Sequence, residues 1–217
     1  MRYQFYREHK YVSAALNDLE RLIAKTDFRE ESGLTKVAEE FSALAQMLKS
    51  HAQYEDESLH SLLKKKNSPV YLHVEQDHIH QEEQLAEVQS LIDQVGSART
   101  NEEKIALGYK LYLTYRKFVG DNLVHLHEEE TIILPELQRL YTDKELQEVE
   151  AETYRTMTVD EMKEMLQHLF PYMNPSDKEA FLRDISELEP AKYSILKERL
   201  SDLLDKGELH NLHVAAF

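Results

Sequence analysis

The chain contains no cysteine, and this absence excludes disulfide bonds, iron–sulfur clusters and thiolate metal sites. Any transition metal must therefore be held by nitrogen and oxygen donors. The 5 glycines and 5 prolines among 217 residues are too few for the frequent tight turns of an all-β fold. No apolar run reaches the length of about 18 residues that a membrane-spanning helix needs. The expected class is a helical protein that does not cross a membrane.

Positive charge is also scarce, since 26 Lys and Arg stand against 41 Asp and Glu, for a formal net charge of -15. This excess repels phosphate backbones and anionic headgroups, so neither nucleic acid nor a membrane surface is expected as a partner. Solubility explains most of the acidity, and cations are the ligands that it favours. The first residues, MRYQFYREHKYVSAAL, carry charges and aromatic rings instead of an apolar signal segment, which predicts a cytoplasmic location.

Four long stretches carry apolar residues at alternating three- and four-residue steps, the period of an amphipathic helix. Polar breaks separate them near residues 26–33, 64–69 and 96–103. The last break contains Thr100 and Glu103, the spacing of a capping box. Short connections make sequential helices antiparallel neighbours. The sequence therefore predicts an all-α fold, with an up-down-up-down four-helix bundle over residues 1–141.

Shorter helical segments follow the bundle, at about residues 143–155, 159–169, 175–187 and 190–205. Asn174 or Ser176 is expected to cap the third of them after a turn containing proline. We expect residues 142–217 to form a helical extension that packs on the bundle. Its isolated histidines offer no ligand pattern and are expected at structural or surface positions: His168, His210 and His213.

Each of the four apolar stripes of the bundle is interrupted by a histidine, and two of them carry a glutamate one helical turn later. With 11 histidines in an acidic chain, His-x-x-x-Glu spacing also arises by chance, so placement matters more than spacing. His9 and His51 are equally many residues away from the first loop, so on antiparallel helices they lie at the same height. His78 and His125 are nearly equally far from the third loop, with a difference of less than one helical turn, roughly 5 Å. Six residues thus converge on one level of the core: His9, His51, Glu55, His78, His125 and Glu129.

Buried carboxylates without compensation cost several kcal/mol or shift their pKa until they are neutral. A pair of cations compensates them, and imidazole with carboxylate donors suits iron or manganese. A buried polar network or histidines that reach solvent are the alternatives without metal. A single zinc ion needs fewer ligands than the six residues supply.

The pattern His9, His51-x-x-x-Glu55, His78, His125-x-x-x-Glu129 resembles that of hemerythrin-like HHE domains. The similar segments are REHKYVSAALNDL, HAQYEDESLHSLL, QDHIHQEEQLAEV and HLHEEETIILPEL, within residues 1–141. The resemblance implies two non-haem iron ions, bridged by Glu55, Glu129 and an oxo or hydroxo group, with manganese or zinc as alternatives. It places His9 and His51 on one iron, and His78 and His125 on the other. One position then stays open for O2, NO, peroxide or water.

The third helix departs from the marine oxygen carriers, which have two histidines there, one turn apart. Here Val74 precedes His78 by four residues and Glu82 follows it by four. The lost nitrogen ligand disfavours reversible O2 carriage and favours a more reactive iron. Glu82 is a candidate replacement ligand, with a solvated position as the alternative.

Other polar residues near the pattern are expected to lie outside the site. One face of the third helix has metal-like spacing but polar neighbours, and is expected to face solvent: His73, Gln76, Asp77, His80 and Gln84. Two histidines lie one position off the stripes and are expected at the surface: His60 and His127. Three tyrosines are candidates for hydrogen bonds to the ligands: Tyr54, Tyr115 and Tyr141.

Three functions fit this sequence. The first is a sensor, in which O2 or NO bound at the open iron position biases the C-terminal helices. The second is an enzyme-like role in iron, oxidative or nitrosative stress, such as NO or peroxide reduction or iron donation. The third is a metal-free helical interaction module, which the buried ligand set disfavours.

Overall fold

The computed structural model describes residues 6–200 and Leu204, apart from the side chains of residues 72–75. Within these described residues every regular element is a helix and no strand occurs. The chain divides into two compact units. The larger is Val12–Leu140, and the smaller combines Met1–Tyr11 with Tyr141–Phe217. The predicted all-helical class is confirmed.

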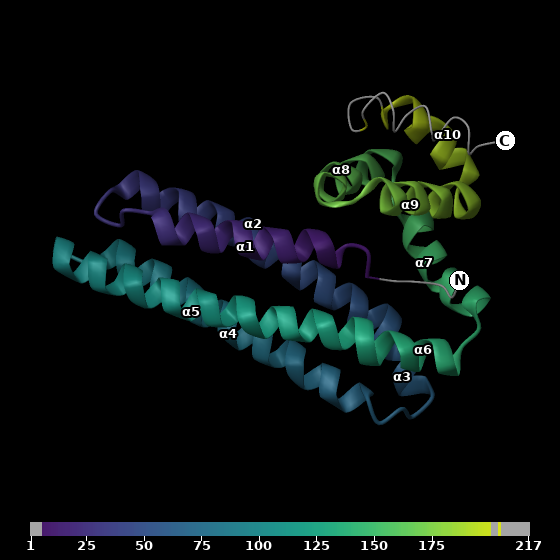
Figure 1. Ribbon diagram of the computed structural model, residues 1–217, viewed down its shortest axis with the longest axis horizontal. Helices are drawn as coiled ribbons and strands as arrows, with labels where there is room; N and C mark the ends of the chain where they lie inside the picture. Colours follow the sequence, from purple (N-terminus) through teal and green to yellow (C-terminus); the bar gives the residue numbers. More distant parts are fainter. Residues whose placement is uncertain (1–5, 201–203, 205–217) are drawn as a thin grey trace. The chain divides into compact units, whose positions relative to one another are not determined.

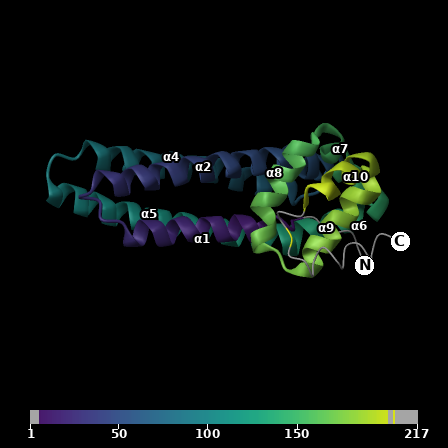
Figure 2. The ribbon, with the colours of Figure 1, turned by 90° about the horizontal axis from the view of Figure 1, so that it is seen from above.

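The larger unit is built from long helices that lie lengthwise beside one another (Figures 1 and 2). They are α1 (His9–Lys25), which enters this unit at Val12, α2 (Glu31–Tyr54), α4 (Tyr71–Ser97) and α5 (Asn101–Glu128). Short loops connect α1 to α2 and α4 to α5, within the predicted breaks. The expected capping box is present at the start of α5, where the backbone N–H of Glu103 donates to Oγ1 of Thr100 at 3.1 Å.

The stripes predicted from the sequence form the core of this unit. Buried side chains from all four helices pack together, among them Leu16, Phe41, Val88, Leu111 and Phe118. Burial of these apolar faces against one another is the main source of stability in such a bundle.

Two of the long helices continue as π-helices. The segment η1 (Glu55–His60) joins α2 to α3 (Ser61–Lys65), and η2 (Glu129–Ile133) joins α5 to α6 (Leu134–Leu140). Each π-helix begins at a glutamate of the predicted site.

The π-helices change which residues are buried after the two glutamates. Hydrogen bonds from residue i to i+5 add one residue per turn, so the buried face moves one position along the chain. A continued α-helical period would place Leu62 and Ile132 in the core. The structure buries Leu63 and Ile133 instead, at 0% and 2% exposure, and leaves Ile132 44% exposed.

The smaller unit contains shorter helices: α7 (Asp143–Thr156), α8 (Val159–Leu169), the 3-10 turn η3 (Phe170–Tyr172), α9 (Pro175–Leu188) and α10 (Pro190–Glu198). The bounds of α7, α8 and α9 agree with the predicted segments to within a few residues. α10 ends at Glu198, and residues 201–203 and 205 of the predicted segment 190–205 lie outside the described residues. Asn174 caps α9, since its side chain accepts from the backbone N–H of Asp177 at 3.0 Å. An apolar core joins α8, α9 and α10, with Leu166, Phe170 and Leu182 at its centre.

Residues before Val12 make several contacts within the smaller unit. Arg7 pairs with Asp184, and Lys10 pairs with Asp177. The ring of Tyr11 lies 5.4 Å from that of Tyr172. The predicted division into a bundle domain over residues 1–141 and an extension over residues 142–217 stays a prediction. Packing of the C-terminal extension on the bundle stays a prediction.

Among the described residues, no histidine of the C-terminal helices belongs to a group of potential metal ligands. The ring of His168 is exposed and lies 6.2 Å from that of Tyr11, in keeping with the predicted surface position. His210 and His213 lie outside the described residues.

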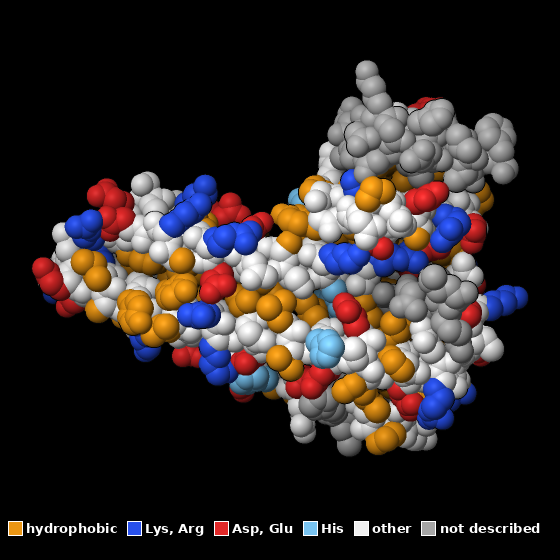
Figure 3. Space-filling view, viewed as in Figure 1, with side chains coloured by type: hydrophobic (Ala, Val, Ile, Leu, Met, Phe, Trp, Pro, Cys, Tyr) orange, Lys and Arg blue, Asp and Glu red, His pale blue; other side chains and the backbone are white. Residues whose placement is uncertain are grey.

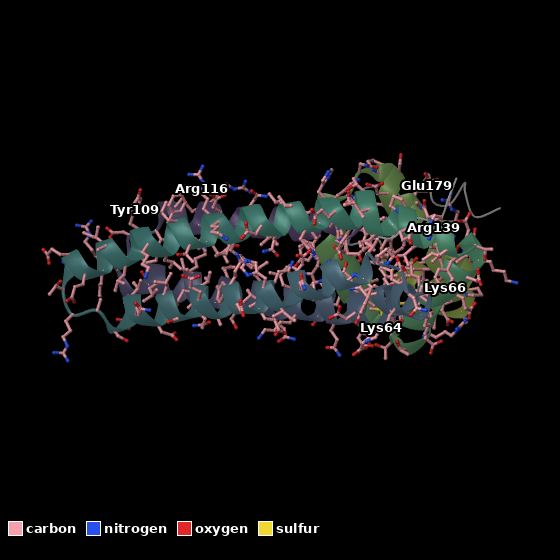
Figure 4. The ribbon with its side chains drawn as sticks, turned by 90° about the horizontal axis from the view of Figure 1, so that it is seen from below. Lys64, Lys66, Tyr109, Arg116, Arg139 and Glu179 are labelled. Carbon is pink, nitrogen blue, oxygen red and sulfur yellow. The ribbon has the colours of Figure 1, made fainter. Side chains whose placement is uncertain are left out.

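The surface of α5 carries a row of exposed apolar side chains, Ile105, Tyr109 and Leu113. Hydrophobic side chains gather over this part of the bundle among interspersed acidic and basic ones (Figure 3). Tyr109, which is 64% exposed, and Arg116 project away from α5 (Figure 4). Across the described part of the chain, no helix has the length and apolar character to cross a bilayer.

Candidate metal centre

Two fully buried carboxylates define the centre of the candidate site. Glu55 is 0% exposed and Glu129 is 1% exposed, and they come from η1 and η2. An ionised carboxylate loses several kcal/mol of hydration on burial unless a partner compensates it. Two such groups at one level of a core therefore require positive charge close by.

Imidazole nitrogens face these carboxylate oxygens. The distances are 3.3 Å from His51 Nε2 to Glu55 Oε1, 3.6 Å from His78 Nε2 to Glu55 Oε2, and 3.5 Å from His125 Nε2 to Glu129 Oε2. Ordinary N–H···O hydrogen bonds are shorter, about 2.7–3.2 Å. Two donors that share one metal ion, each about 2.1 Å from it, lie roughly 3.0–3.6 Å apart. The spacing therefore fits metal ligands better than hydrogen-bonded pairs.

Five of the six predicted ligands are brought together within the larger unit. Single donor atoms of Glu55, His78, His125 and Glu129 all lie within 4.8 Å of one another. Donor atoms of His51, Glu55 and Glu129 do the same. The two carboxylates belong to both groups.

The sixth predicted ligand, His9, is the first residue of α1 and is counted with the smaller unit. Its side chain is 2% exposed, and its ring stacks on that of Tyr6 with centroids 4.5 Å apart. His9 is therefore a buried imidazole, as the sequence predicted.

An aspartate holds the other ring nitrogen of His78, since Oδ1 of Asp56 lies 3.0 Å from Nδ1 of His78. A carboxylate at Nδ1 favours the tautomer that carries its proton there and leaves Nε2 as the donor to a metal. Oδ2 of Asp77 lies farther from Nδ1 of His125, at 3.6 Å. Asp77 was expected to face solvent, so its position beside His125 is a correction.

The charge states of these groups suit metal binding. Burial, reinforced by the nearby imidazoles His78, His51 and His60, lowers the pKa of His125 to about 3 against the raising effect of Glu55. His125 is therefore neutral at pH 7, with a lone pair on Nε2. Burial opposes protonation of His78, but its pKa is raised because Glu55 and Asp56 outweigh that effect. A metal ion held by His78 would compete with a proton for this imidazole.

His60 is a site residue that the sequence analysis missed. It was expected at the surface, yet it is 1% exposed and its Nε2 lies 3.5 Å from Oε1 of Glu129. In an α-helix, residues five apart point about 140° away from each other. The π-helix brings His60 onto the face of Glu55 instead. The only sequence signal was a histidine five residues after the glutamate.

The remaining predictions near the site have mixed outcomes. His127 and His80 are exposed, as expected. Gln84 was expected in solvent but is 7% exposed, and it donates to Asp121. Tyr115 is not a partner of a predicted ligand, because its hydroxyl donates to the carbonyl of Leu16 at 3.0 Å.

Glu82, the candidate replacement ligand, is exposed. Among the described residues, it does not belong to any group whose donor atoms lie close enough together to hold a metal ion. The side chains of His73 and Val74 lie outside the described residues. Tyr54 and Tyr141 are half-buried, and their role stays a prediction.

The candidate site lies in a segment of the chain that matches a known protein family. The model of the hemerythrin HHE cation-binding domain matches residues 1–137. The chain belongs to this family. Comparison of the HHE protein with curated proteins and with solved structures finds no match. Family membership makes cation binding the expected property of the His and Glu cluster, and the site's donor set fits it.

Two hollows open beside the metal-type cluster of the HHE protein. One, of about 430 Å³, has Asp56, His78 and Glu82 in its wall. The other, of about 380 Å³, is lined in part by Asp77 and His125. Both are large enough to admit water or a molecule of two or three atoms to the edge of the site.

Proposed function

We propose that this HHE protein holds a non-haem di-iron centre that binds O2, NO or peroxide. The observation that carries the proposal is the pair of buried carboxylates, Glu55 and Glu129, with imidazoles 3.3–3.6 Å from their oxygens. Nitrogen and oxygen donors of this kind suit iron, and a chain without cysteine offers no thiolate ligand. Manganese and zinc are the alternative metals.

In this proposal Glu55 and Glu129 would contribute to both ions, and His78 and His125 would hold one of them. His51 would hold the other ion. This division follows the two groups of donor atoms, which share only the carboxylates.

His9 is proposed as the partner of His51. It lies three residues before Val12 and seven before Leu16 on one uninterrupted helix, so the three side chains share a face. Val12 and Leu16 are 1% and 0% exposed in the bundle core. The up-down-up-down order predicted from the sequence would bring this face to the level of Glu55.

Two iron ions held there would supply two electrons and an open position for a small ligand. The protein contributes two buried carboxylates, neutral imidazole at His125 and hollows lined in part by His78 and His125. Such a centre serves either a sensor or a protein that handles oxidative, nitrosative or iron stress by NO or peroxide reduction or iron donation. We propose a cytoplasmic location and no nucleic-acid or membrane partner.

Metal analysis of purified protein reconstituted with Fe(II) tests the proposal. About two iron ions per chain are expected, with a near-ultraviolet absorption that dithionite bleaches. The double variant Glu55→Ala/Glu129→Ala is expected to lose both ions. The matched control is Glu57→Ala/Glu130→Ala, whose carboxylates are exposed neighbours, and it should load like the wild type. A wild-type protein that takes up no metal would refute the di-iron centre and favour a metal-free interaction module.

Turnover then separates the two roles of a loaded centre. Steady consumption of NO or peroxide with a reductant indicates an enzyme. Reversible binding without turnover indicates a sensor.

A further inference from the structure

One face of α5 carries three large apolar side chains at exposed positions of successive helical turns. Ile105, Tyr109 and Leu113 are 54%, 64% and 45% exposed. Their four-residue spacing places them along one side of the helix. Single exposed apolar residues are common on soluble proteins, but a contiguous row with polar residues at its ends is typical of an interaction surface.

Charged residues of opposite sign stand at the two ends of this row. Glu102 lies three residues before it and Arg116 three residues after it, so both share its face. Both are exposed, and the contact of Arg116 with Glu20 spans 3.9 Å and leaves the Arg116 side chain 65% exposed. Tyr109 and Arg116 project from the outer side of α5 (Figure 4). We name these five residues the α5 stripe: Glu102, Ile105, Tyr109, Leu113 and Arg116.

The spacing of the α5 stripe is symmetric about its middle residue, Tyr109, and its charge is reversed between the two ends. The steps along the chain are three, four, four and three residues. When two copies of α5 pack antiparallel about a twofold axis at Tyr109, Glu102 of one copy faces Arg116 of the other. Ile105 faces Leu113 in the same way. A twofold interface requires this self-complementarity, because each of its contacts occurs twice.

The local charge of α5 also favours contact with a second copy. The whole chain has a formal net charge of -15, so two copies in general repel each other. Between residues 101 and 121, however, four basic residues stand against three acidic ones, for a local net charge of +1. Repulsion is therefore weak where two such segments meet. The residues counted are Lys104, Lys110, Arg116 and Lys117, and Glu102, Glu103 and Asp121.

We propose that the α5 stripe is the interface of a twofold symmetric homodimer, in which two α5 helices pack antiparallel with Tyr109 at the axis. Burial of the three apolar side chains supplies the attraction, and the two Glu102–Arg116 pairs fix direction and register. One helix from each copy makes a small interface, so a Kd of about 10–100 µM is expected. The proposal does not depend on the metal centre.

Sedimentation equilibrium of the full chain at about 1–500 µM measures this association. The wild type should change from monomer to dimer within that range. Tyr109→Glu places two like charges at the axis and should weaken dimerisation by at least about 10-fold. The matched control is Ile195→Glu, which adds the same charge at a 49% exposed apolar residue of the smaller unit and should dimerise like the wild type. Tyr109→Ser is measured alongside, in case the buried-side packing of α5 does not tolerate glutamate.

Charge reversal tests the antiparallel pairing. Glu102→Arg and Arg116→Glu each place like charges at both ends of the contact, so each variant alone should dimerise about 10-fold more weakly. Glu102→Arg also makes the chain less acidic, and a change in general repulsion alone would strengthen its association instead. The double variant Glu102→Arg/Arg116→Glu keeps the net charge of the wild type and restores opposite charges at both ends. Its affinity should return to within about threefold of the wild-type value.

Three results would overturn the proposal. A wild type that stays monomeric across the whole concentration range would exclude the homodimer and leave the α5 stripe to a different protein. A dimer that persists in folded Tyr109→Glu and Tyr109→Ser would lie on another face. Single charge reversals that associate like the wild type, or a double variant that associates no better than they do, would exclude the antiparallel pairing. Circular dichroism checks that each variant is folded.

Discussion

Oδ1 of Asp56 lies 3.0 Å from Nδ1 of His78 and also 3.0 Å from Nδ1 of His60, so one carboxylate orients two imidazoles of the site. The burial cost of Asp56 raises its pKa, but the two histidines outweigh it and the net shift is downward. Asp56 is thus ionised at neutral pH. Its side chain is 51% exposed, so the group contributes little to the core and much to the orientation of its partners.

Replacement of Asp56 by alanine is expected to weaken Fe(II) binding by about 10- to 100-fold, because His78 loses the acceptor that fixes its tautomer and ring position. Titration of the metal-free protein measures the affinity. Glu57→Ala, an exposed neighbour, is the control. Equal affinity in the two variants would show that Asp56 does not support the ligands.

Gly108 and Gly120 lie on the same helix but in different surroundings. A Cβ atom on Gly108 would lie 2.2 Å from the ring of Phe28, whereas one on Gly120 would meet nothing within 4 Å. Gly108→Ala is expected to lower the free energy of unfolding by about 1–3 kcal/mol through overpacking. Gly120→Ala is expected to raise it by about 0.5–1 kcal/mol, since alanine favours a helix. Urea denaturation of both variants checks the pair, and equal signs would contradict the described packing of α5.

The hydroxyl of Tyr115 donates to the backbone carbonyl of Leu16, which links α5 to α1. Tyr115→Phe removes this buried bond and should lower the free energy of unfolding by about 1–3 kcal/mol, because the carbonyl loses its partner. Iron content should remain that of the wild type. The exposed Tyr109→Phe serves as a control for stability. Loss of iron in Tyr115→Phe would mean that this tyrosine contributes to the site.

Glu150 gives the smaller unit a pH-dependent stability. Its Oε2 atom is buried, and burial raises the pKa of the carboxyl group from 4.5 to about 7, against the hydrogen bond from Tyr154. The folded protein then holds this proton more tightly than the unfolded chain does. The contribution is fully present below pH 4.5 and declines as pH rises to about 7, by at most about 3 kcal/mol.

Glu150→Gln should remove this decline, because glutamine is neutral at every pH. Chemical denaturation at several pH values between 4.5 and 8 measures the difference between variant and wild type. The variant is expected to gain stability relative to the wild type as pH rises. A constant difference across this range would show that Glu150 is not perturbed.

Local patterns in the sequence predicted most of the helices. The α-helical period of apolar residues identified the elements, and Thr100 and Asn174 marked two helix starts through their side-chain bonds to the backbone. These signals are local, because a helix depends on residues three and four apart. For the same reason, His51 with Glu55 and His125 with Glu129 were recognisable as pairs on one helix face.

Tertiary structure decided what this period does not encode. At Glu55 and Glu129 each helix widens into a π-helix, which rotates everything that follows, so His60 and Leu63 turn inward and Ile132 turns outward. A pattern of three- and four-residue steps does not reveal this change, because the i to i+5 hydrogen bonds of a π-helix alter the number of residues per turn. The tertiary structure also places Asp56 beside His78 and Asp77 beside His125, in each case on a different helix. The sequence by itself determined which residues are available as ligands, and the tertiary structure determined which imidazoles the two glutamates meet.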